Sequence, residues 1–173
     1  GPMDARALRL GNRLLGNDTA AAGLEITMSG PTLRFNCDAV VAVTGADIPL
    51  SVDGAAQPMN TALLIHAGST LALGTIAGSG ARSYLSVRGG IQVPDYLGSK
   101  STFTLGQFGG HNGRALRTGD VLHLSAGVSP VAPAEVPGEL RPAISNQWEL
   151  RVIYGPHGAP DFFTGKDIDS FFA

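Results

Sequence analysis

Apolar residues near the start of the chain recur at intervals of four, three and four, the repeat of one face of an α-helix. The apolar positions are Met3, Ala7, Leu10 and Leu14, and the charged residues between them are Asp4, Arg6, Arg9 and Arg13. Separate apolar and charged faces predict an amphipathic helix. Gly16-Asn17 follows. Glycine just beyond a helix takes up the left-handed conformation that ends it, so we expect the helix to stop there.

From residue 24 to about residue 125 the pattern changes to short apolar runs separated by turn residues. The runs that predict strands are 24–28, 32–35, 39–43, 62–65, 70–73, 83–87 and 121–124. The turn sequences between them include Ser29-Gly30-Pro31, Asp53-Gly54, Ala67-Gly68 and Thr118-Gly119-Asp120. Strands of this number and spacing predict a mainly β fold, a barrel or a sandwich, which the first helix plugs or flanks.

The remaining segments have other patterns. Residues 98–113 are rich in glycine and show no alternation, which predicts a long ordered loop of the kind that often has a function; the alternative is a disordered loop. Residues 128–142 are rich in proline and predict a linker or an extended crossing segment. Trp148–Tyr154 alternates like a strand, and Thr164 and Asp167 have the spacing of a capping box, which predicts a short C-terminal helix.

Length and composition favour one globular domain, or one domain and a short addition. The chain has 173 residues, against roughly 150 for a typical domain. It contains 24 glycines and 11 prolines, yet 43% of its residues are hydrophobic and 15% are charged, the opposite of a disordered composition.

Charge and hydropathy exclude several classes of partner. The net charge is −2 and there is no basic tract, so nucleic acid is not an expected partner. No run of about 20 mainly apolar residues predicts a membrane helix. No signal peptide is evident, because Asp4 and several arginines follow Met3, and we expect a cytoplasmic protein. Cys37 is the only cysteine and the four histidines are scattered, so we expect no disulfide and no metal site.

Two short polar stretches follow predicted strands and are candidates for a site. Thr44 and Asp47 come just after the strand at 39–43; the alternative is a turn in which Asp47 bonds nearby backbone. Arg88-Gly89-Gly90 follows the strand at 83–87, and paired glycines allow a ligand or another backbone to approach closely. Here the alternative is a tight turn with Arg88 in a salt bridge.

The glycine-rich loop supplies further candidates. Ser101 and Thr102 offer hydroxyl groups, and His111 lies between Gly109-Gly110 and Gly113. Neither this loop nor Gly78-Ser79-Gly80 has the sequence of a phosphate-binding loop or a dinucleotide fingerprint, and no nucleophile elbow is present. These residues alone predict a β-rich domain with one polar, glycine-lined surface, and they do not identify a reaction.

Several blocks of sequence resemble the carboxyltransferase component of biotin-dependent urea carboxylase, the first half of urea amidolyase chemistry. Its relatives include allophanate hydrolase subunit 2 and bacterial 5-oxoprolinase subunits. The matching blocks are Gly1-Pro2-Met3-Asp4, 10–17, 24–27, 43–47, 84–91, 96–106 and Phe108-Gly109-Gly110. The first two blocks are more similar to urea carboxylases than to oxoprolinase subunits.

The resemblance implies a cyclophilin-like β-barrel as the first of two subdomains. On this basis residues 1–127 are the barrel, lacking an initial strand-rich stretch, 128–142 are a linker, and 143–173 begin a second, truncated subdomain. The chain is therefore expected to be a fragment that is inactive by itself.

The resemblance also implies a biotin-dependent enzyme of the ligase class that transfers a carboxyl group from carboxybiotin to urea, giving allophanate. Biotin would arrive on a separate carrier domain, and ATP and magnesium would be used by a separate biotin carboxylase domain. The expected partners are these two domains and the second carboxyltransferase subdomain. The alternatives are a protein like the C subunit of 5-oxoprolinase and a non-catalytic module that binds or regulates a partner.

Carboxyl transfer needs a site that excludes water, donors for the ureido oxygen and a base. Asp47 or His111 is the candidate base, and amides of Gly89, Gly90, Gly109 and Gly110 are candidate donors. Thr44, Arg88, Ser101 and Thr102 are further candidates for binding urea or biotin. The alternative role of the glycines is to form an interface between subdomains. The main catalytic residues are expected outside this chain.

Overall fold

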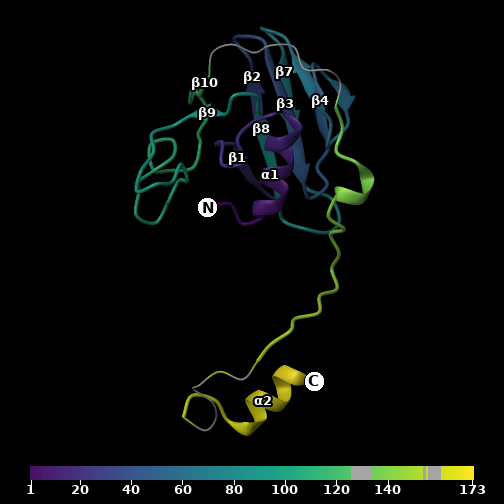
Figure 1. The fold of residues 1–173 in the computed structure, drawn as a ribbon, viewed down its shortest axis with the longest axis vertical. Helices are drawn as coiled ribbons and strands as arrows, with labels where there is room; N and C mark the ends of the chain where they lie inside the picture. The colour runs from purple at the N-terminus through teal and green to yellow at the C-terminus, as the bar shows by residue number, and fades with distance from the viewer. Residues whose placement is uncertain (126–133, 154, 156–160) are drawn as a thin grey trace.

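The computed structural model describes residues 1–125, 134–153, 155 and 161–173 (Figure 1). The helices are α1 (Ala5–Leu14), the 3₁₀ helix η1 (Gly138–Leu140) and α2 (Gly165–Phe172). The strands are β1 (Leu24–Thr27), β2 (Thr32–Arg34), β3 (Ala39–Gly45), β4 (Leu50–Val52), β5 (Ala55–Gln57), β6 (Leu63–Ile65), β7 (Thr70–Leu73), β8 (Arg82–Val87), β9 (Ile91–Gln92) and β10 (His123–Leu124).

Most strands belong to two four-stranded antiparallel sheets. One sheet has the order β1-β8-β3-β6 and the other β2-β7-β4-β5, while β9 and β10 form a separate ribbon. The predicted mainly β fold with a helix near each end is confirmed. The strand predicted at 121–124 is shorter than expected, and the sequence patterns did not predict β4, β5 or β9.

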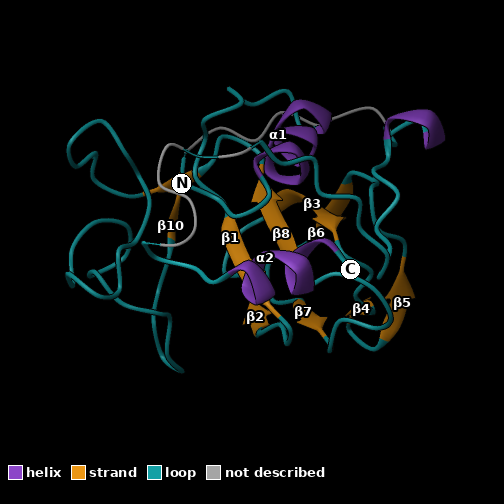
Figure 2. Ribbon diagram, turned by 90° about the horizontal axis from the view of Figure 1, so that it is seen from below, coloured by secondary structure: helices purple, strands orange, loops and turns teal. Residues whose placement is uncertain are grey.

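The core lies between the two four-stranded sheets, and α1 covers the opposite face of the first sheet (Figure 2). Side chains alternate along a strand, so Val41 and Val43 of β3 face the core, whereas Val40 and Ala42 belong to a second cluster with Leu15 after α1. Burial of both faces explains why β3 is almost continuously apolar. The helix therefore flanks the sheet.

Local contacts fix α1 on this face. The Asp4 carboxylate accepts a hydrogen bond from the Ala7 amide at 2.9 Å and caps the helix. The Thr44 hydroxyl of β3 donates to the Ala7 carbonyl at 2.8 Å. The predicted helix is confirmed, but Met3 precedes it and is 74% exposed, so the buried face begins at Ala7.

The C-terminal part lies apart from the sheets (Figure 1). Residues 134–136 still contact them, since the Ala62 amide donates to the Ala134 carbonyl and the Val136 amide to the Asn60 carbonyl. The strand predicted at Trp148–Tyr154 is wrong over 148–153, and Tyr154 lies outside the described residues. Trp148 and Leu150 are exposed there and pair with no strand in the described part of the chain. The predicted C-terminal helix and its capping box of Thr164 and Asp167 are confirmed.

Candidate functional site

A groove of about 1420 Å³ runs between the N-terminal part of the chain and the glycine-rich loop. One wall includes residues from the first half of α1, β1 and the segment 16–23, and the other includes residues 98–102, 104, 110–111 and 114–116. Six of the predicted site residues line this groove: Arg88, Gly89, Ser101, Thr102, Gly110 and His111. The structure therefore brings candidates from the Arg88-Gly89 turn and from the glycine-rich loop to one groove.

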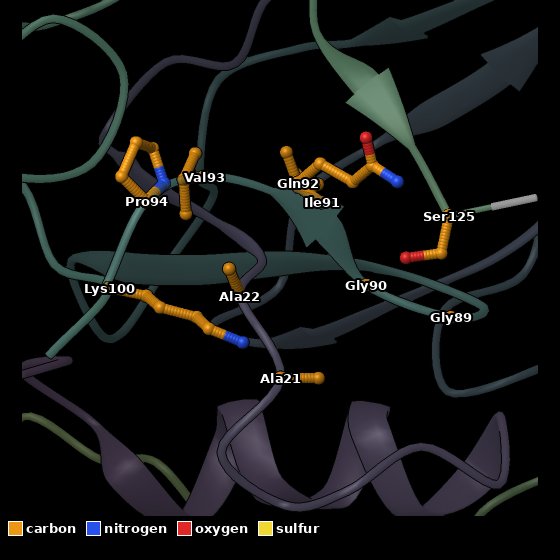
Figure 3. A pocket seen from close by; sticks show the side chains of 10 residues that line it. All are labelled: Ala21, Ala22, Gly89, Gly90, Ile91, Gln92, Val93, Pro94, Lys100 and Ser125. Carbon is orange, nitrogen blue, oxygen red and sulfur yellow. The ribbon is translucent and has the colours of Figure 1, made fainter. Parts of the chain in front are cut away.

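A smaller pocket of about 360 Å³ adjoins this groove (Figure 3). Ala21 and Ala22 form one wall, and residues 89–94 form the other. The side chain of Lys100 enters from the glycine-rich loop, and Ser125 lies on the far side (Figure 3). Lys100 has no ion pair among the residues that the structure describes, so its ammonium group is available to an anion.

The Gly89-Gly90 pair forms the tight turn between β8 and β9. Both residues have positive φ angles, 80° and 79°, which glycine adopts readily. The Gly90 amide donates to the Val87 carbonyl at 2.8 Å, and the Gly89 amide donates to Asn17 Oδ1 at 2.8 Å. These two amides are therefore engaged within the protein, which does not support their predicted use as donors to a ligand.

The amides of the second glycine pair, Gly109 and Gly110, are free among the described residues, unlike those of Gly89 and Gly90. The amides of Gly109 and Gly110 donate to no acceptor within the described part of the chain. Gly110 has φ 50°, and a Cβ atom there would overlap the Thr102 hydroxyl. Only glycine fits at position 110. Ser101 and Thr102 therefore have a structural role, because they form the surface against which Gly109 and Gly110 pack.

Aromatic contacts order the glycine-rich loop. Phe103 and Phe108 exchange backbone hydrogen bonds of 2.9 and 3.3 Å, and their ring centroids lie 5.1 Å apart. Tyr96 packs on Phe108 at a centroid distance of 4.9 Å. The loop therefore has a defined conformation, as predicted, although it contains no strand of the main sheets.

An ion-pair cluster lies at the end of this loop. Asp120 accepts two hydrogen bonds from the Arg114 guanidinium, at 2.7 and 2.8 Å, and one from the Arg117 amide at 2.7 Å. The guanidinium, followed by the amide, holds the pKa of Asp120 well below its usual range, and Asp120 in turn raises the pKa of Arg114. His111 Nε2 lies 3.8 Å from Asp120 Oδ1, so a permanent carboxylate faces the imidazole.

The structure does not bring Thr44 and Asp47 into the groove. Thr44 is 1% exposed and its hydroxyl is used by α1. Asp47 is exposed, and the Ala77 amide donates to its carbonyl. Because β3 and β8 are antiparallel, Asp47 lies near the start of β8 and Arg88 near the start of β3. About six residues of extended chain put these two ends about 20 Å apart.

Sequence reasoning missed Lys100, Arg114, Asp120 and Asn17. Lys100 directly precedes Ser101 and Thr102, which were selected for their hydroxyl groups. Asp120 belongs to Thr118-Gly119-Asp120, which was interpreted only as a turn. No spacing rule links Asp120 to His111, since their contact depends on how the loop closes.

The residues that the structure describes contain neither a metal-binding group of side chains nor a membrane-spanning helix. Among these there is no group of three or more His, Cys, Asp or Glu side chains that would hold a metal ion. None of the helices in this part of the chain is long and apolar enough to cross a membrane.

The chain is similar to proteins of known classes. A family model described as "Carboxyltransferase domain, subdomain A and B" matches residues 1–173. Urea amidolyase of Saccharomyces cerevisiae is 45% identical over 179 residues, which is 100% of this chain and 10% of that protein. Urea carboxylase of Kluyveromyces lactis superposes with a TM-score of 0.88 at 41% identity, covering 99% of this chain and 16% of that one.

A second type of relative is also similar. The 5-oxoprolinase C subunit of Escherichia coli is 43% identical over 122 residues, which is 70% of this chain and 39% of that protein.

Proposed function

The chain belongs to the family of carboxyltransferase domains with subdomains A and B, and from this premise we propose that it contributes to a urea carboxylase. In this role it helps to transfer a carboxyl group from carboxybiotin to urea, giving allophanate. The observation that supports the proposal most is the similarity to urea amidolyase and urea carboxylase along essentially the whole chain. It agrees with the resemblance found in the sequence blocks.

The groove offers the groups that this chemistry needs. The Lys100 ammonium would hold a carboxylate, because it faces the small pocket and has no acidic partner among the described residues. Gly110 lines the groove, and its free amide, with that of the adjacent Gly109, would donate to a ureido oxygen on which negative charge develops. Bound carboxybiotin would supply the carboxyl group.

We assign the base to His111 rather than Asp47, because His111 lines the groove and Asp47 does not. In this assignment the imidazole accepts a proton from the attacking urea nitrogen as the new N–C bond forms, and it returns this proton to the ureido nitrogen that loses the carboxyl group. Asp120 then stabilises the imidazolium, since its depressed pKa keeps it ionised. Arg88, Ser101 and Thr102 line the same groove and are proposed to contact urea or the ureido ring.

The rest of the enzyme would complete the reaction. The chain spans about a tenth of the curated urea amidolyases that it matches. We propose that the biotin carrier, the biotin carboxylase that uses ATP and magnesium, and further carboxyltransferase residues belong to the other parts. The 173 residues alone are then expected to form no allophanate.

A 5-oxoprolinase C subunit is the second candidate, because such relatives align with 70% and 79% of this chain. The deciding experiment uses the complete source protein, loaded with biotin and supplied with ATP and bicarbonate. We expect ADP release that depends on urea, with allophanate as product. Consumption of 5-oxoproline without any response to urea would overturn the proposal in favour of the second candidate. No response to either substrate would favour a non-catalytic module.

A further inference from the structure

Two asparagines join the end of α1 to the turn between β8 and β9. Asn12 is fully buried, and its side-chain amide donates to the carbonyls of Ala21 at 2.9 Å and Thr19 at 3.4 Å. Asn17 donates from Nδ2 to Asn12 Oδ1 at 3.0 Å and to the Val87 carbonyl at 2.8 Å. The Asn17 oxygen accepts from the Gly89 amide at 2.8 Å.

These bonds connect the two walls of the small pocket. The Asn12 amide holds the segment that leads into Ala21 and Ala22, and Asn17 holds the turn at Gly89. The Ile91 amide then donates to the Ala22 carbonyl at 3.1 Å and closes the connection. Gly90 is packed so closely that an added Cβ atom would lie 3.3 Å from Ala21 Cβ. A small shift of either wall therefore changes the width of the pocket.

We propose that Asn17, oriented by Asn12, is a positioning residue that sets the distance between these walls and thereby the orientation of the group bound beside Lys100. Identifying that group as a carboxylated ureido ring rests on the proposed function. The positioning role rests on the hydrogen bonds.

The primary amide is the chemical requirement. One end of the Asn17 side chain must donate to two oxygens, those of Val87 and Asn12, and the other end must accept from the Gly89 amide. An aspartate at position 17 still accepts from the Gly89 amide, but its second carboxylate oxygen replaces the NH₂ group and faces the oxygens of Asn12 and Val87. An alanine removes all three bonds.

A matched control lies at the other end of the same sheet. Ser83 in β8 is also fully buried, and its hydroxyl donates to the Ala46 carbonyl at 2.6 Å. The variant Ser83→Ala loses a buried hydrogen bond without touching the pocket. It separates a general loss of stability from a change in position.

The experiment compares Asn17→Ala, Asn17→Asp and Ser83→Ala in the complete enzyme, at a temperature where melting curves show each to be folded. Hydrogen exchange is followed by mass spectrometry for residues 18–22 and 87–91. Turnover with urea and ATP-dependent carboxylation of biotin are measured in parallel. Asn17→Asp is the variant to use if Asn17→Ala does not fold.

We expect both Asn17 variants to speed exchange in these two segments and to lower kcat with urea by about 10-fold to 100-fold, leaving biotin carboxylation unchanged. Ser83→Ala should change neither readout. Unchanged exchange at 87–91 in the Asn17 variants, or an equal loss of turnover in Ser83→Ala, would overturn the inference. If the unaltered enzyme does not respond to urea, the proposed function fails, and the exchange result alone decides the role of Asn17.

Discussion

The two ends of the sheet β1-β8-β3-β6 look alike in sequence and differ in the structure. At one end Thr44 lies near the end of β3 and Asp47 follows this strand, and at the other Arg88, Gly89 and Gly90 follow β8. Because β3 and β8 are neighbouring antiparallel strands, the residues that follow them lie at opposite ends of the sheet. Arg88 and Gly89 line the groove together with Lys100 and other residues of the glycine-rich loop, whereas Thr44 and Asp47 line neither the groove nor the small pocket.

A polar stretch after a strand is therefore evidence for a site only together with the direction of that strand. In a parallel sheet both stretches would lie at one edge. Here the Asp47 end is a turn whose backbone is bonded to neighbouring residues, and the Arg88 end is one wall of a pocket. Variants of the complete enzyme can separate the two ends.

The largest effect is expected from His111→Ala compared with Asp47→Asn. Removing a general base typically lowers kcat by about 100-fold to 10,000-fold, whereas Asp47 lies about 20 Å from Arg88. Steady-state turnover with urea measures both variants. Asp47→Asn should stay within about twofold of the unaltered enzyme, within the scatter of surface substitutions. A large loss in Asp47→Asn with normal turnover in His111→Ala would reverse the assignment.

A somewhat smaller loss of kcat is expected for Gly110→Ala. The added Cβ atom would overlap the Thr102 hydroxyl and displace the amides proposed to donate to the ureido oxygen. Loss of one such donor costs about 100-fold to 1,000-fold in kcat. Gly68→Ala is the matched control, because its φ is also positive, 91°, and nothing lies within 4 Å. Equal turnover of the two variants would exclude this role for the loop.

Lys100→Met is expected to lower kcat/KM about 10-fold, as the loss of one charge-assisted hydrogen bond would. The chain contains one other lysine, Lys166 on the exposed helix α2, so Lys166→Met is the control. Turnover is measured over a range of urea concentrations, and biotin carboxylation is followed separately. If both lysine variants behave like the unaltered enzyme, the small pocket is not an anion site.

The smallest effect concerns the stability of the loop at low pH. The pKa of Asp120 is lowered in the folded chain by Arg114, so the stability that it adds is complete above its unfolded pKa, about 3.8, and falls as pH drops below that value. Loop protection in hydrogen exchange, corrected for intrinsic rates, should be constant from pH 7 to about pH 5 and decrease only below about pH 4. In Asp120→Asn, loop protection should be weak at every pH, as in the unaltered chain at low pH. Protection that falls between pH 7 and pH 5 would contradict this.

Much of the fold follows from local patterns. The helix α1 has a regular apolar repeat, strands such as β3 and β8 contain short apolar runs bounded by turn residues, and the capping box identifies the start of α2. The short hairpin of β4 and β5 was missed because three residues on each side of Asp53-Gly54 are too few to establish alternation. Trp148–Ile153 alternates, but alternation alone makes no strand without a neighbour to pair with.

The site was predictable in part. Arg88 and Gly89 were candidates because they follow an apolar strand, and Ser101, Thr102, Gly110 and His111 because they lie in the glycine-rich loop. All six line the groove. The contacts of Asp120 with His111, and of Asn17 with Gly89, join residues that are far apart or unrelated by any spacing rule. They arise from loop closure and helix packing.

Hydrogen exchange of the complete enzyme, with and without free biotin and urea, tests the central claim most directly. The claim is that ligands bind at the Arg88 end of the sheet, against the glycine-rich loop. We expect slower exchange at 88–93 and 98–111 when both ligands are present, and no change at 44–48. Protection at 44–48 with an unchanged loop would contradict the account.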